Sequence, residues 1–224
     1  MDTKEPVSIF WFRRDLRLAD NTGLYHALRS GFPVLPVFIF DIEILDRLEE
    51  KADRRVAFIT AALEELNRNL IATGSSLKIC RGTPETAFRK IMEEYVVKAV
   101  YANRDYEPYA TVRDGQISRM LNAAGIPVHS FKDQVIFEKN EVVKSDGAPY
   151  TVFTPYSRAW KKLITAKETE PVPAERLSGN FLKRAPSKIP SPEEIGFITA
   201  ATLSPVPSVS EEIVRNYHLT RDTP

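Results

Sequence analysis

Charged and polar side chains gather where the apolar runs of this sequence end. Arg13 and Asp15 follow the run 7–12. Asp41 follows the run 34–40. If these runs are parallel strands, their carboxyl ends meet at one edge of a sheet, and the side chains converge on a single crevice. Carboxylates, an amide and guanidinium groups beside Phe and Tyr faces suit a flat heteroaromatic ligand better than a triphosphate. The full set is Arg13, Arg14, Asp15, Arg17, Phe40, Asp41, Asp53, Arg54, Arg55 and residues 103–109.

Each of these groups also has a structural interpretation, which we keep open. The charged residues after the first run could form a salt-bridge network that fixes the loop and faces a partner domain. Asn21, Asp41 and Asp53 could cap helices, because a short side-chain oxygen accepts an N–H of the first helical turn. Arg55 could pair with a neighbouring carboxylate.

The sequence lacks the residues that several common kinds of binding site require. The first run is followed by no glycine until Gly23, and neither G-x-G-x-x-G nor a P-loop motif occurs, which excludes the usual phosphate cradles. His26, His129 and His218 are scattered without a second ligand at helical spacing, so we expect no metal site. Cys80 is the only cysteine, which excludes a disulfide framework.

The elements that must position these groups alternate along the chain. Apolar residues at intervals of three and four predict helices, for example over 56–70, where Gly74 then ends the helix. The fold class predicted is α/β, a Rossmann-like doubly wound five-stranded parallel sheet with helices on both faces. The predicted strands are 7–12, 34–40, 77–80, 99–101 and 127–131.

The remainder of the chain has a different character. Residues 165–224 hold eight of the 16 prolines, which block both ladder and helix donors. We therefore predict a domain over 1–164 and an extended, Pro-rich linker over 165–224, lying on the domain or running to another one, with a short helix at 210–217.

Before that linker, Gly147 is predicted to turn a hairpin between 135–137 and 150–153. A helix is predicted to start at Thr154-Pro155. Core packing is the role expected of four aromatic residues here, Tyr150, Phe153, Tyr156 and Trp160.

Composition is that of an ordinary globular protein, with 43% hydrophobic and 27% charged residues and a net charge of only +1. This charge gives no sign of a dedicated nucleic-acid binder, so any DNA contact needs a local patch. The first six residues lack the apolar core of a secretion signal, and the longest apolar stretch is too short for a membrane. We expect a cytoplasmic monomer.

Four stretches, in order and spacing, resemble motifs of the DNA photolyase/cryptochrome family. Residues 10–21 (FWFRRDLRLADN) are similar to the family's opening signature, and 103–109 (NRDYEPY) to its segment after strand four. Residues 147–160 (GAPYTVFTPYSRAW) resemble the motif that closes the α/β domain, and 191–197 (SPEEIGF) resemble part of its interdomain linker.

The resemblance implies an N-terminal domain that binds a light-harvesting antenna chromophore. In the family, a C-terminal helical domain binds FAD and damaged DNA, and reduced FAD, excited through the antenna, donates an electron that splits a pyrimidine dimer, a carbon–carbon lyase reaction. The family's FAD segment would follow Pro224, so we expect an excised domain with no catalytic residue, inactive without its own C-terminal domain. A cryptochrome-type blue-light photoreceptor and a stand-alone nucleotide-binding α/β module remain alternatives.

Family members with a deazaflavin antenna hold it with an aspartate after strand two, an arginine at the next helix start and an acid after strand four. The resemblance places these roles on Asp41, Arg55 and Asp105. The folate-type site uses other residues where this chain has Tyr109 and Ala110. A deazaflavin is therefore favoured over a folate, and FMN stays possible because its ring is nearly isosteric with a deazaflavin. With three further pocket walls, the candidate cofactor-binding residues are Asp41, Arg55, Asn103, Asp105, Tyr106 and Glu107.

Overall fold

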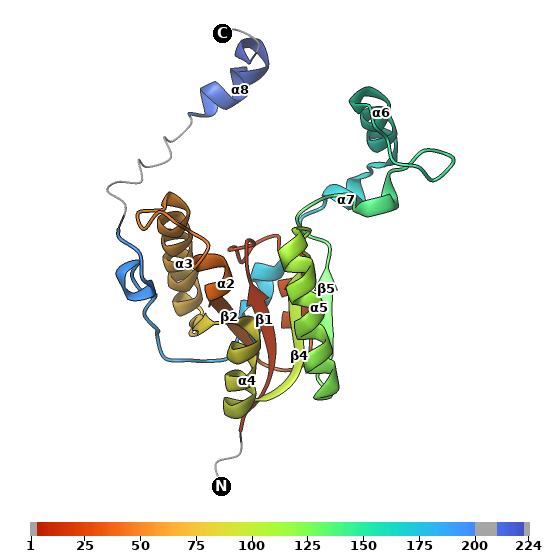
Figure 1. The fold of residues 1–224 in the computed structure, drawn as a ribbon. Helices are drawn as coiled ribbons and strands as arrows, with labels where there is room; N and C mark the ends of the chain where they lie inside the picture. The colour runs from red at the N-terminus through yellow and green to blue at the C-terminus, as the bar shows by residue number, and fades with distance from the viewer. Residues whose placement is uncertain (1–3, 200–209, 222–224) are drawn as a thin grey trace.

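A computed structural model describes residues 4–199 and 210–221. Strands and helices alternate as far as the fifth strand, and helices and short 3-10 turns follow (Figure 1). The strands are β1 (Pro6–Phe12), β2 (Val34–Asp41), β3 (Lys78–Gly82), β4 (Val96–Asn103) and β5 (Val128–Phe131). The α-helices are α1 (Thr22–Leu28), α2 (Ile42–Leu45), α3 (Arg54–Ala72), α4 (Pro84–Glu94), α5 (Pro108–Ala123), α6 (Phe153–Leu163), α7 (Ala166–Thr169) and α8 (Glu211–Thr220). The 3-10 helices are η1 (Lys139–Glu141), η2 (Ala174–Asn180) and η3 (Glu193–Ile195).

The five strands are all parallel and lie in the order β3-β2-β1-β4-β5. The chain moves outward from β1 to β3 and then crosses back to β4, so the strand order reverses between β1 and β4. In open α/β sheets, the carboxyl ends of the strands at such a point form the ligand crevice. The doubly wound five-stranded parallel sheet predicted from the sequence is confirmed.

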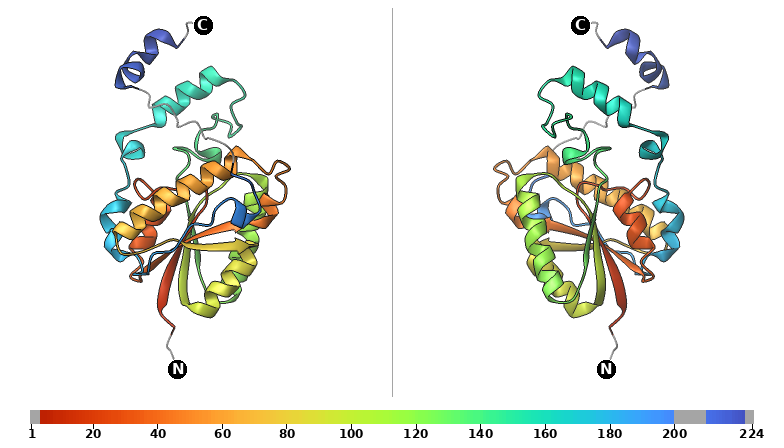
Figure 2. Two further views of the ribbon diagram at one scale, coloured as in Figure 1. Left: turned by 90° about the vertical axis from the view of Figure 1, so that its left-hand side faces the viewer. Right: turned by 90° about the vertical axis from the view of Figure 1, so that its right-hand side faces the viewer.

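Helices cover both faces of this sheet (Figure 2). Phe10 and Phe12 of β1 belong to the core cluster that includes residues of α1 and α3. Ile9 and Trp11, which point to the opposite face, belong to the cluster that includes residues of α4 and α5. Apolar side chains on both faces explain why the strands show no polar alternation.

Helix α3 forms as its sequence pattern predicts. The Asp53 carboxylate accepts the Arg55 N–H at 2.8 Å and so caps the first turn. Gly74, with φ +79°, ends the helix in the left-handed conformation that glycine adopts without a steric cost. The residues of its apolar stripe that become buried are Val56, Leu63, Leu66 and Leu70.

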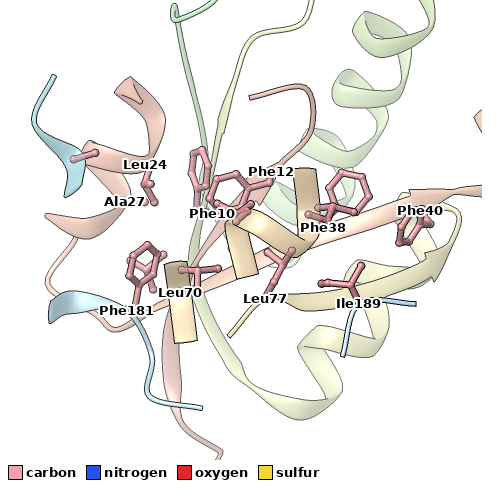
Figure 3. Packing of buried hydrophobic residues seen from close by; sticks show 14 of the residues in the cluster. Phe10, Phe12, Leu24, Ala27, Phe38, Phe40, Leu70, Leu77, Phe181 and Ile189 are labelled. Carbon is pink, nitrogen blue, oxygen red and sulfur yellow. The ribbon is translucent and has the colours of Figure 1, made fainter. Parts of the chain in front are cut away.

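A C-terminal segment, which we name the strap and define as residues 174–199, lies on the face that carries α1 and α3. Phe181 and Ile189 pack in the same cluster as Leu70 and Leu77 (Figure 3). Phe181 also forms an isolated bridge with Val34, at the start of β2. Part of the predicted extended linker therefore lies on the domain and completes its core.

The predicted hairpin is wrong. Residues 132–152 are all described and form no strand; around Gly147 the chain makes only a turn, in which Lys144 N–H donates to Ala148 O at 2.9 Å. Residues 135–137 and 150–152 form no ladder, and Phe153 already belongs to α6.

The expected core packing of aromatic residues around α6 is also wrong. Phe153 is 78% exposed and Tyr156 is 36% exposed, and none of the α6 residues, all described, is buried. Trp160 and Tyr156 of this stripe meet the rings of Phe137 and Tyr150, but Phe153, on its outer part, is left uncovered by the described chain. The helix itself forms as predicted, and so does α8, which Ser210 caps by accepting the Ile213 N–H.

Across the described ranges, every helix is either too short or too polar to cross a membrane.

Candidate functional site

A small cavity of about 110 Å³ opens at the carboxyl ends of β1 and β4, where the strand order reverses. Its volume is well below the roughly 300–1,000 Å³ of typical small-molecule pockets. The lining comes from three loops, those that follow β1, β4 and β5. These residues are Arg13, Arg14, Asp15, Arg17, Asn103, Arg104, Asp105, Asp133 and Gln134.

Asn103 uses its amide to tie two loops together beneath this cavity. Its Nδ2 donates to Asp15 Oδ2 at 2.6 Å and to Asn21 Oδ1 at 2.9 Å, and its Oδ1 accepts the Gly23 N–H at 2.8 Å. Both amide hydrogens are therefore engaged within the protein. Asn103, predicted as a pocket wall, supports the pocket and has one remaining lone pair for a ligand.

The first turn of α1 is already filled by side chains. The Thr22 N–H donates to Asp133 Oδ1 at 2.8 Å, and the Leu24 N–H donates to Asn21 Oδ1 at 3.0 Å. With the Gly23 N–H on Asn103, three N–H groups that a nucleotide phosphate accepts in dinucleotide folds are occupied. This arrangement argues against a phosphate at the start of α1.

Ion pairs hold the cavity rim. Arg14 Nε lies 3.3 Å from Asp105 Oδ2, and its Nη2 lies 3.7 Å from Glu107 Oε1. The Arg14 side chain is 60% exposed whereas that of Asp105 is 11% exposed, so the arginine is the outer partner of this pair. Arg17 Nη2 pairs with Asp133 Oδ2 at 2.8 Å. The arginines after β1 therefore form salt bridges as predicted, although their acidic partners come from other loops and from α5; that this network faces a partner domain stays a prediction.

Asp41 is buried at the end of β2 and points towards α5. Its Oδ1 accepts the Glu43 N–H at 3.1 Å, the predicted cap of α2, and its Oδ2 accepts the Tyr109 hydroxyl at 2.6 Å. The Arg113 guanidinium lies 4.0 Å from the same oxygen. Burial, together with the hydrogen bond to Asp41, raises the pKa of Tyr109, so this phenol stays a proton donor at neutral pH.

Arg55 lies in the first turn of α3. Its guanidinium forms a bidentate pair with Asp53, with Nη2 2.6 Å from Oδ2, and its side chain is 72% exposed. The hydrogen bond from Arg55 holds the pKa of Asp53 below its ordinary value. Both predicted roles, capping by Asp53 and pairing by Arg55, are confirmed.

Tyr106 makes a contact that the sequence did not indicate. Its hydroxyl donates to the Glu138 carboxylate, which also pairs with Arg104. Burial and the Glu138 hydrogen bond raise the pKa of Tyr106. Glu138 is buried, and together with Glu141 it forms the capping box of η1.

The candidate residues fall into two groups. Asn103 and Asp105 line the cavity, with Tyr106 and Glu107 following directly in the chain. Asp41 and Arg55 lie outside the cavity lining, and each is bonded to neighbours of its own. Asp133 was not identified as a site residue from the sequence. Its position directly after β5, at the same edge of the sheet, is the signal that identified the other residues and could have identified it too.

The sequence model of the DNA photolyase family matches residues 8–176. The chain belongs to the DNA photolyase family. A deoxyribodipyrimidine photo-lyase of Synechococcus sp. (strain ATCC 27144) is 31% identical over 203 residues, covering 91% of this chain and 39% of the relative. One from Halobacterium salinarum is 34% identical, covering 85% of this chain and 41% of the relative. An uncharacterised 31.6 kDa protein of Synechococcus sp. (strain PCC 6716) is 36% identical, with 67% of its length covered.

Solved photolyases have the same fold. A class III photolyase from Agrobacterium tumefaciens superposes with a TM-score of 0.72 at 26% identity, covering 88% of this chain and 39% of that one. An archaeal photolyase from Sulfolobus tokodaii, solved with two FAD molecules, gives a TM-score of 0.62 at 28% identity, covering 76% of this chain and 40% of that one. The chain thus corresponds to the N-terminal portion of photolyases and spans about two fifths of their length.

Proposed function

We propose that this chain is the antenna-binding portion of a deoxyribodipyrimidine photolyase, a blue-light-driven, FAD-dependent lyase that splits pyrimidine dimers in DNA. Its membership of the photolyase family carries the proposal. FAD and the damaged DNA would bind in a portion C-terminal to this chain, so the chain alone is not expected to repair DNA. A cytoplasmic, monomeric protein is the expected setting.

The antenna site is proposed at the carboxyl edge of the sheet, with Asp41, Arg55 and Asp105 as its principal residues. Carboxylate acceptors and a guanidinium donor match the N–H and C=O groups along the edge of a deazaflavin or flavin ring. The Arg55 side chain is largely exposed although it pairs with Asp53, and Asp105 pairs with the largely exposed side chain of Arg14. When bound, the chromophore absorbs blue light and transfers the excitation to reduced FAD.

The residues of this chain would orient the ligand and exclude competitors. Asp41 would accept a ring N–H in place of the Tyr109 hydroxyl, which is now bonded to its Oδ2. FMN carries a phosphate, and the N–H groups that open α1 are already bonded to Asp133, Asn103 and Asn21. These occupied N–H groups support a deazaflavin over FMN. Tyr109, whose hydroxyl is bonded to Asp41, stands where the folate-type site uses another residue, which supports a deazaflavin or FMN over a folate.

The absorption spectrum and repair activity of the intact protein that carries this chain test the proposal. We expect an FAD spectrum, a second band from the antenna, and splitting of pyrimidine dimers under blue light but not in the dark. FAD without repair would favour the cryptochrome-type photoreceptor instead. An intact protein without any flavin would refute both functions.

A further inference from the structure

Helix α6 leaves an apolar face uncovered. Phe153 is 78% exposed, Val152 is 61% exposed and Leu163 is 47% exposed, and Tyr156 lies beside them at 36%. We name these four residues the α6 face. Isolated exposed apolar side chains are ordinary, but a contiguous group on one helix marks an interaction surface.

The helix is amphipathic, with charge opposite the apolar stripe. At 100° per residue, Phe153, Tyr156 and Leu163 lie on one side, whereas Arg158 and Lys162 lie on the other, and Lys161 flanks the stripe next to Phe153. The inner part of the stripe already has partners, since Trp160 meets the Phe137 ring edge-on at 5.7 Å and Tyr156 meets Tyr150 at 6.2 Å. These contacts hold α6 against the segment that contains Phe137 and Tyr150, and they leave Phe153 and Leu163 uncovered.

The position of α6 relates this face to the candidate site. Both figures show the helix standing beyond the carboxyl edge of the sheet, away from the helices that cover the sheet (Figures 1 and 2). The cavity at the ends of β1 and β4 opens at that same edge. A partner seated on α6 would therefore lie on the side of the domain where the cavity is exposed.

We propose that the α6 face is the docking surface for the portion of the polypeptide that photolyases carry beyond the matched region. The inference rests on the proposed function. The matched relatives are covered over only 39% and 41% of their lengths, so most of each polypeptide lies outside the match and follows this domain. The partner surface is apolar at its centre, with a carboxylate at the rim to meet Lys161, which flanks the stripe.

The test compares hydrogen exchange of the α6 amides in the intact protein and in the 224-residue chain alone. We expect exchange at least 10-fold slower in the intact protein, because a docked partner excludes water from the helix. Phe153→Glu should abolish that difference, whereas Phe58→Glu, at a residue of α3 that is 60% exposed, should leave it unchanged. Leu163→Glu provides a second variant, and circular dichroism of each variant checks that it is folded.

Two outcomes would overturn the docking surface. One is equal α6 exchange in the intact protein and the chain alone. The other is a dimer of the chain alone that Phe153→Glu dissociates, since a second copy would then cover the face. Flavin content and repair are measured on the same samples. If α6 is protected but the protein contains no flavin, the docking surface is supported and the proposed function is refuted. If the protein repairs DNA but α6 is not protected, the proposed function is supported and the docking surface is refuted.

Discussion

The Oδ1 atom of Asn103, at the end of β4, lies 2.8 Å from the backbone nitrogen of Gly23, in the first turn of α1. This hydrogen bond joins residues 80 positions apart and holds the helix against the strand end. A Cβ at position 23 would lie 2.6 Å from that oxygen and 3.2 Å from the Ala102 carbonyl carbon. Only glycine allows this approach, and the loop after β1 is positioned by it.

Gly23→Ala should therefore destabilise the fold by about 1–3 kcal/mol, the usual cost of forcing an extra group into a packed site. Urea unfolding followed by circular dichroism measures the change. Gly115→Ala is the matched control: a Cβ in the middle of α5 would meet Arg119 Nη1 at an ordinary 3.7 Å. Because alanine favours a helix over glycine by about 1 kcal/mol, the control should be neutral or stabilising.

The strap should be as necessary to the domain as its strands. Phe181 is 3% exposed in the main core, so Phe181→Ala should cost about 3–5 kcal/mol. Ile198→Ala changes a strap residue that is 62% exposed and should be nearly neutral. Equal free energies of unfolding for the two variants would mean that the strap does not pack as described.

The phenol of Tyr109 reports on Asp41. Because burial and the hydrogen bond to Asp41 both raise the pKa of Tyr109, Asp41→Asn should lower it part of the way towards its ordinary value. Phenolate absorbance during alkaline titration measures the shift, and Tyr109→Phe identifies the signal. Tyr106, whose pKa is raised by burial and by Glu138, is the internal control and should not move.

Acid should weaken the start of α3. Arg55 holds the pKa of Asp53 below its unfolded value, so the pair contributes stability at neutral pH that is lost as the pH falls through the folded pKa. The loss should fall below about pH 4, where unfolded aspartate begins to take up its proton. Asp53→Asn should flatten the dependence of the unfolding free energy on pH in that range; an unchanged slope would contradict the pairing.

The sheet and its helices could be predicted because both signals are local. A run such as 34–40 is apolar on both faces, as a strand covered on two sides must be, and Asp53 and Gly74 mark the two ends of α3. The α6 stripe was misread for a physical reason: periodicity shows that a helix has an apolar side, but not what covers it.

The candidate site could be predicted only in part. The rule that strand ends converge placed Asn103 and Asp105 at one cavity. It did not show that the Asn103 amide donates its hydrogen bonds to Asp15 and Asn21. It also did not show that Asp133 accepts a backbone N–H of the first turn of α1. Such partners come from loops far away in the sequence, and residue spacing carries no information about them.

The most direct test of the antenna site is an equilibrium titration of the chain with a deazaflavin chromophore, followed by its absorption. We expect saturable binding that Arg55→Met and Asp105→Asn each weaken about 10-fold or more, about 1.4 kcal/mol. Arg68→Met, at an exposed arginine later in α3, should leave the affinity unchanged. Binding that is indifferent to Arg55 and Asp105, or binding of ATP in place of the chromophore, would contradict the site.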